Sequence, residues 1–165
     1  DSSITVVDYF NDNATSKLAA YIDNTSDVAT AFTRSDKDIS ISNVQEFDNS
    51  VWQFRSINLT GTSNDDTITG YTGNDSIVGG LGSDSIVSGA GNDTISGGAG
   101  NDYLDGGVGN DSILSGDGND TIIGGTGNDT IVLEGGSNTL IFTGSFGDDT
   151  VSGTSSNDVL RFASN

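Results

Sequence analysis

The 165-residue sequence contains no proline, cysteine, histidine or methionine. Without histidine, the chain can form neither a Ser-His-Asp or Cys-His nucleophile nor a His-ligated zinc site. Without cysteine, disulfides, zinc fingers and iron–sulfur ligation are excluded as well. Positive charge is also scarce, since 5 Lys and Arg stand against 24 Asp and Glu, for a formal net charge of -19. Such a chain repels nucleic acid and anionic lipid, so its natural partners are cations.

Long hydrophobic runs are missing too, and none approaches the roughly 18 apolar residues of a membrane-spanning helix. Only 32% of the residues are hydrophobic, which together with the high charge is typical of disordered chains. The composition is uneven, however, because all 24 glycines lie between Gly61 and Gly153. Residues 1–60 have a net charge of -5 and residues 61–165 one of -14. The chain therefore changes architecture near residue 60.

Residues 61–161 repeat with a period of nine, and units such as GGAGNDYLD, GGVGNDSIL and GGTGNDTIV follow one another directly. There are eleven units, interrupted only by Phe142 and Thr143. The eighth position is aliphatic in every unit: Ile68, Ile77, Ile86, Ile95, Leu104, Ile113, Ile122, Ile131, Leu140, Val151 and Leu160. The sixth position is aspartate in all units but one, which has Asn138: Asp66, Asp75, Asp84, Asp93, Asp102, Asp111, Asp120, Asp129, Asp149 and Asp158.

One apolar residue in nine cannot build the stripe of an amphipathic helix, and the glycines destabilise helix further. The last three positions of each unit, rich in Thr, Ser, Ile and Val, predict a short strand whose middle side chain is buried. The first six positions are then expected to form a turn. Glycine at positions one, two and four permits positive φ there, so that carbonyl oxygens can converge beside the aspartate.

A carboxylate beside converging carbonyls is a set of hard oxygen ligands, which calcium prefers. If two units make one coil of a solenoid, units i and i+2 lie about 4.8 Å apart, the spacing of neighbouring strands. Asp75 then lies over Asp93, and Asp84 over Asp102. Unpaired carboxylates at that separation repel one another, so the stack is expected to need a divalent ion between neighbouring loops.

These units resemble the GGxGxDxUx nonapeptide of RTX (repeat-in-toxin) proteins. The resemblance implies an all-β fold, a right-handed parallel β-roll (a β-solenoid) with calcium bound between successive turns. It also implies a block of a large bacterial protein that a type I exporter secretes to the medium or the cell surface.

The resemblance further implies that the ligands are the carboxylate at position six and carbonyls around positions two and four. Five inter-loop calcium sites follow, on two edges of the roll. One edge uses Asp75, Asp93, Asp111, Asp129, Gly73, Gly89, Gly91, Gly107, Gly109, Gly125 and Gly127. The other edge uses Asp84, Asp102, Asp120, Gly80, Gly82, Gly98, Gly100, Gly116 and Gly118. The end units depart from the pattern, and calcium is expected there in altered geometry near Asp66, Asp149 and Asp158.

Residues 1–60 are expected to form a β-rich cap or spacer at the open end of the roll, with Trp52 and Phe54 in the core of the cap. Strands are expected at Ile4–Phe10, Leu18–Ile22, Val28–Phe32, Ile39–Ser42 and Val51–Leu59, with a brief helix as the alternative around Ser16–Ile22. The roll is expected at 61–161, and residues 162–165 are read as the start of a further spacer.

The leading functional hypothesis is a calcium-binding module that is disordered without calcium and folds on binding it outside the cell, supporting secretion and folding of a larger protein. The module itself is expected to be non-enzymatic and monomeric. Two alternatives stay open: a surface-recognition module, as in an adhesin, S-layer or ice-binding protein, and an accessory domain of a secreted enzyme.

Overall fold

The computed structural model describes residues 56–163 in full and, of the preceding residues, the backbone of five short strands. These strands are β1 (Thr5–Val7), β2 (Ala19–Tyr21), β3 (Thr33–Ser35), β4 (Asp38–Ser42) and β5 (Glu46–Asp48). Twelve more strands follow within the fully described part. No helix is found among the described residues, and the all-β prediction is confirmed.

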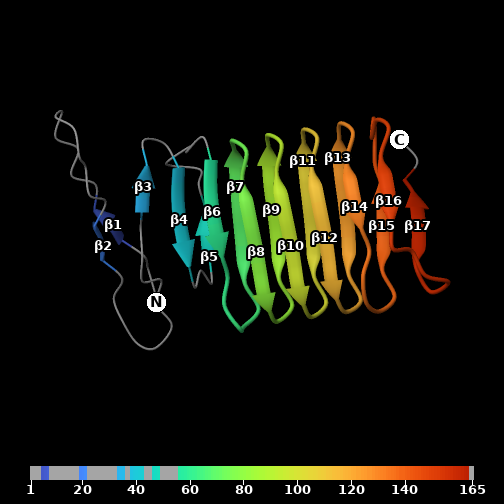
Figure 1. Cartoon of the computed structure of the whole chain (residues 1–165), viewed down its shortest axis with the longest axis horizontal. Helices are drawn as coiled ribbons and strands as arrows, with labels where there is room; N and C mark the ends of the chain where they lie inside the picture. Colours follow the sequence, from blue (N-terminus) through green and yellow to red (C-terminus); the bar gives the residue numbers. More distant parts are fainter. Residues whose placement is uncertain are drawn as a thin grey trace.

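β1 and β2 form a separate antiparallel pair. The other strands form two stacked sheets, and the chain alternates between these sheets from β4 onward (Figure 1). The first sheet continues from β3 and β4 through β6 (Ser56–Thr60), β8 (Ser76–Leu81), β10 (Thr94–Ala99), β12 (Ser112–Asp117), β14 (Thr130–Val132) and β16 (Thr150–Ser152). The second sheet continues from β5 through β7 (Thr67–Thr72), β9 (Ser85–Ala90), β11 (Tyr103–Val108), β13 (Thr121–Thr126), β15 (Thr139–Phe142) and β17 (Val159–Phe162). Apart from the antiparallel β3–β4 pair, the neighbours in both sheets are parallel.

Strand register confirms that two repeat units make one coil. Ile77 of β8 pairs with Ile95 of β10, which pairs with Ile113 of β12, so equivalent residues recur every eighteen positions. The molecule is therefore a parallel β-solenoid, as the period predicts. This stacking brings each unit against its second neighbour along the chain, which is the arrangement on which the inter-loop sites depend.

The eighth-position column forms the thin core between the two sheets. From Ile68 to Leu140 every member of the column is at most 1% exposed. The column begins before the repeat, since Ile57 and Leu59 are equally buried. At the C-terminal end the column becomes exposed to solvent, because Leu160 lies on the last strand of its sheet and is 47% exposed.

The expected division into a three-residue strand and a six-residue turn is wrong. Strand β8 covers the last three positions of one unit and the first three of the next, and the other full strands do the same. Only positions four to six, such as Gly82 to Asp84, make the turn. The reason is that glycines at position two keep their ladder partners, as Gly80 does with Gly98, so extended pairing continues across them.

The two sheets extend to the N-terminal side of Gly61, because β4 pairs with β6 and β5 pairs with β7 in parallel. The expected strands Ile4–Phe10 and Leu18–Ile22 have shorter counterparts in β1 and β2, and the expected strand Ile39–Ser42 corresponds to β4, which begins one residue earlier. A strand replaces the alternative helix at Ala19–Tyr21. The expected strand Val28–Phe32 lies outside the described residues, as do Trp52 and Phe54. The boundary at residue 60 stays a prediction.

The inserted pair Phe142 and Thr143 is absorbed without loss of register. Across it, Thr130 pairs with Thr150 and Leu140 with Leu160, so the coil lengthens from eighteen to twenty residues. Phe142 is 8% exposed, and its ring stacks on that of Phe162 at 4.8 Å, with the Phe146 ring at 5.1 Å. An aromatic cluster thus closes the C-terminal end of the core.

Candidate metal centre

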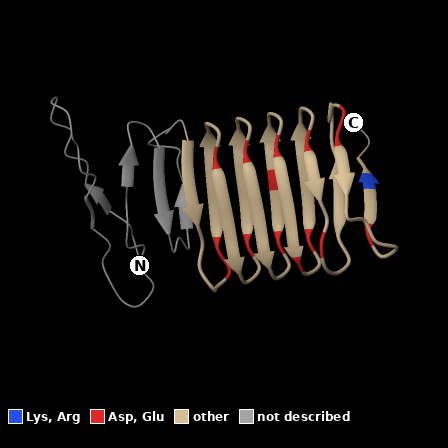
Figure 2. Ribbon diagram, viewed as in Figure 1, with Lys and Arg blue, Asp and Glu red and all other residues tan. Residues whose placement is uncertain are grey.

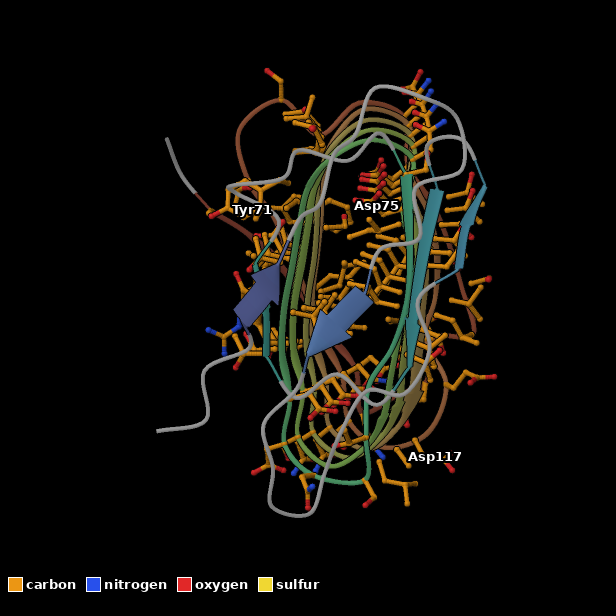
Figure 3. All side chains as sticks on the ribbon, turned by 90° about the vertical axis from the view of Figure 1, so that its left-hand side faces the viewer. Tyr71, Asp75 and Asp117 are labelled. Atoms are coloured by element: carbon orange, nitrogen blue, oxygen red, sulfur yellow. The ribbon has the colours of Figure 1, made fainter. Side chains whose placement is uncertain are left out.

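The position-six aspartates form two columns, one inside each curved edge of the flattened coil. Viewed along the solenoid, Asp75 points into the interior, and carboxylates of the following coils line up behind it (Figure 3). In the perpendicular view the acidic residues lie in rows along both edges (Figure 2). The members from Asp66 to Asp129 are all at most 3% exposed.

One oxygen of each carboxylate is used by a ladder of hydrogen bonds between coils. The backbone N–H of Asp75 donates to Oδ1 of Asp93 at 2.7 Å, and that of Asp93 donates to Oδ1 of Asp111 at 2.8 Å. On the other edge, the N–H of Asp84 donates to Oδ1 of Asp102 at 2.8 Å. The ladder holds neighbouring loops in register and fixes the direction of every carboxylate.

The second oxygen of each carboxylate is left over. Within residues 56–163, seven buried side-chain oxygens lack a hydrogen-bond partner, and all are Oδ2 atoms of this column: Asp75, Asp84, Asp93, Asp102, Asp111, Asp120 and Asp129. A buried ionised oxygen without a partner is costly, and native proteins rarely contain more than a few such polar groups. Seven such oxygens in two columns therefore indicate binding sites for a ligand that carries positive charge.

The pKa values of the column aspartates also indicate sites for a cation. Burial, assisted by the neighbouring Asp93 carboxylate, raises the pKa of Asp75 to about 7. Burial, with the charges of Asp93 and Asp129, raises the pKa of Asp111 to about 7, and burial raises that of Asp84 to about 6. Protein surroundings alone thus disfavour the ionised columns, and a cation placed between the carboxylates would reverse this effect.

The predicted carbonyl donors lie on the glycines that flank each aspartate turn. All thirteen glycines predicted at positions two and four have positive φ, from 90° at Gly107 to 146° at Gly91. The carbonyl oxygen of each of these glycines lies close to the equivalent glycine of the next coil, where there is one. A β-carbon added at Gly98 would collide with the oxygen of Gly80, and one at Gly100 with that of Gly82. A side chain at either position of these loops would therefore clash, although Tyr71 takes position two of its unit with a φ of 77°.

Glycine at position one has a different role from the one expected. These residues lack positive φ in the regular units, but a β-carbon added to Gly70 or Gly97 would lie 2.5 Å from Oδ2 of Asp75 or Asp102. The missing side chain thus leaves room for the partnerless oxygen of the same unit.

The ends of the columns differ from the middle. The backbone N–H of Thr62 donates to Oδ2 of Asp66 at 2.6 Å, and its hydroxyl donates to Oδ1 at 2.8 Å. At the other end, the N–H of Ser155 donates to Oδ2 of Asp158 at 2.5 Å, which holds the pKa of Asp158 below its usual value. Asp66 and Asp158 therefore cap their own turns and also take part in the ladder, and Asp149 continues the ladder on the other edge by accepting from the N–H of Asp129.

A second ladder, which the sequence reasoning missed, runs outside the first. At position five, the N–H of Asn92 donates to Oδ1 of Asn74, and the N–H of Asn110 donates to Oδ1 of Asn92, both at 2.8 Å. The other edge carries the same bond between Asn119 and Asn101. The recurrent Asn-Asp pair in the repeat was the available signal, since asparagine readily bonds to nearby backbone.

The residues present fit a hard divalent cation. Each regular loop offers one fixed anionic oxygen, and the loops repeat at the spacing of neighbouring strands. Calcium accepts six to eight oxygen ligands in flexible geometry, which suits a site made from carboxylates and backbone. The seven predicted central aspartates lie in the two columns, each with a partnerless Oδ2. Asp66 and Asp158 belong to one of these columns, but their Oδ2 atoms accept hydrogen bonds within their own turns.

Comparison with known proteins identifies the repeat. The family model of the RTX calcium-binding nonapeptide repeat matches four times, at residues 58–86, 78–113, 109–140 and 143–161. A search of curated proteins finds no match. The part of the chain that the structure describes contains no helix long and apolar enough to cross a membrane. The four matches together span more than half of the sequence. Repeats of this kind form structural modules and are typical of secreted bacterial proteins. The chain belongs to the RTX family of calcium-binding nonapeptide-repeat proteins.

Proposed function

We propose that this chain is a calcium-dependent folding module. In low calcium the solenoid does not form, and in the calcium-rich medium outside the cell it folds and supports type I secretion and folding of a larger protein. Calcium affinities of extracellular modules, about 10⁻⁴ to 10⁻³ M, suit such a switch. The observation that carries the proposal is the set of seven buried carboxylate oxygens without a partner.

The proposed ligands are the Oδ2 atoms of the seven central aspartates, with carbonyls of the flanking glycines. Bound calcium would supply the positive charge that lets these carboxylates stay ionised while buried. The chain's own contribution is positional, because the Oδ1 ladder aims each carboxylate and the glycines leave space for backbone oxygens.

The free-energy balance explains why folding should depend on the ion. The core is one aliphatic side chain wide, as Ile77, Ile95 and Ile113 show by stacking singly in one sheet. Against this modest apolar gain stands a column of buried, mutually repelling carboxylates. A ligand that binds only the folded state then shifts the folding equilibrium toward the solenoid.

Calcium titration of the full chain, followed by far-ultraviolet circular dichroism and reversed with EGTA, tests the proposal. We expect a disordered spectrum without calcium and a β-rich spectrum with it, with a midpoint between about 0.1 and 1 mM. Magnesium serves as the control and is expected to be much less effective, because it requires stricter geometry and keeps its water. A chain that is already β-rich in EGTA and unchanged by calcium would overturn the proposal.

A further inference from the structure

The ninth unit, Leu133 to Ile141, departs from the repeat at several positions, among them position two, where Glu134 replaces glycine. Two of its departures fall at positions that lie close together in the other units. Position one holds Leu133, where the other ten units have glycine or serine, and position six holds Asn138, where the others have aspartate. Both residues are buried, at 1% and 0% exposure. Two rare residues thus occur in one unit, at the positions that the structure shows to be in contact.

The contact between the two positions is visible in the regular units. A β-carbon added to Gly97 would approach Oδ2 of Asp102 to 2.5 Å, and one added to Gly106 would approach Oδ2 of Asp111 to 2.6 Å. Such separations are too short for nonbonded atoms, so a large apolar side chain at position one and the partnerless oxygen compete for the same space. Serine at this position is small, and the hydroxyl of Ser88 donates to the carbonyl of Gly106 at 2.7 Å, so the Oδ2 of Asp93 stays without a partner.

Asn138 keeps the ladder without the need for a cation. Its Oδ1 accepts the backbone N–H of Asp120 at 2.9 Å, as an aspartate would. Its Nδ2 donates to the carbonyl of Gly135 at 3.2 Å, so the second side-chain atom has a partner inside its own turn. Leu133 adds an apolar side chain to the core beside it.

We propose that the Leu133–Asn138 pair makes unit nine a metal-independent coil and ends the calcium array on its edge at the loop of Asp120. The ladder continues on both edges, since the N–H of Asn138 donates to Oδ1 of Asp158 and that of Asp129 to Oδ1 of Asp149. The opposite edge has no such stop, because the residue after Asp129 in its column is an aspartate, Asp149, and not an amide. The array is therefore longer on one edge than on the other. This inference rests on the proposed function and specifies which loops of the chain take calcium.

A gain-of-site experiment tests the inference. The double variant Leu133→Gly/Asn138→Asp restores the repeat residues at positions one and six of unit nine. We expect it to bind about one to two more calcium ions per chain, since the new carboxylate faces a loop on either side. Ion number is measured by equilibrium dialysis with radioactive calcium and by terbium luminescence. A higher calcium midpoint for folding should accompany the gain, because a buried neutral amide becomes a charge.

The converse transfer keeps the test decisive if the first variant does not fold. Gly124→Leu/Asp129→Asn places the same pair in unit eight, where we expect a loss of about one to two ions. An unchanged ion number in the folded first variant, or in the second, would overturn the inference. Wild-type protein that binds no calcium is a distinct result, which would overturn the proposed function and this inference with it.

Discussion

Replacing Asp102 by asparagine separates the two roles of a ladder carboxylate. Asparagine retains the acceptor for the backbone N–H of Asp84, which lies 2.8 Å from Oδ1 in the native chain. It removes the charge of the partnerless Oδ2, which faces the proposed metal position. Asn138 shows that the ladder accepts an amide at this position. The substitution should therefore be harmless to the solenoid itself and harmful to metal binding.

The expected magnitude follows from ligand linkage. Asp102 lies between the loops of Asp84 and Asp120, so two proposed sites lose one anionic ligand each. For a dissociation constant of about 10⁻³ to 10⁻⁴ M, each site stabilises the folded state by about 1.4 to 2.7 kcal/mol at about 10 mM calcium. Losing both would lower the free energy of unfolding by about 3 to 5 kcal/mol at that calcium concentration. Without calcium the same substitution should stabilise the solenoid or leave it unchanged, since it removes a buried charge.

Urea unfolding at several calcium concentrations, followed by circular dichroism, measures the effect. The matched control is Asp105→Asn, which removes the same charge three residues further on, in β11, outside the ladder. The control should shift stability little at any calcium concentration. Equal destabilisation by Asp102→Asn at the lowest and the highest calcium concentration that fold the chain, or none at either, would refute the reasoning.

Three further expectations follow from the same contacts. Because burial raises the folded-state pKa of Asp75 and Asp111 to about 7, their stabilising contribution is complete below their unfolded pKa of about 3.9 and lost as pH rises through about 7. Without calcium, circular dichroism should thus show more β-structure at pH 4 than at pH 8, and the opposite order would contradict the shifts. Ile95→Ala, in the column of fully buried side chains, should cost about 2 to 5 kcal/mol in saturating calcium by urea unfolding, and a cost below about 1 kcal/mol would argue against a packed core. Gly98→Ala should raise the calcium midpoint, because its φ is 109° and its β-carbon would meet the carbonyl oxygen of Gly80, and an unchanged midpoint would show that the loop can relax.

Much of the fold could be predicted because every important contact recurs at a fixed separation along the chain. In a solenoid, residues that stack are one coil apart, so the period that places Ile77 over Ile95 also places Asp75 over Asp93. The core column, the two edges and the direction of pairing all follow from that single repeat. Local propensity was less informative, since it assigned the position-one and position-two glycines to turns although they continue the strands.

The sequence by itself determined the period, the aliphatic column and the aspartate column of this protein. Tertiary structure alone decided which aspartates lack a partner, because this depends on donors that approach a particular oxygen in space. Asp66 and Asp75 occupy the same position of the repeat, yet Thr62 satisfies the first and leaves the second free to bind an ion. It also placed position one against the position-six carboxylate oxygen, as at Gly97 and Asp102, since this contact arises only when the turn closes.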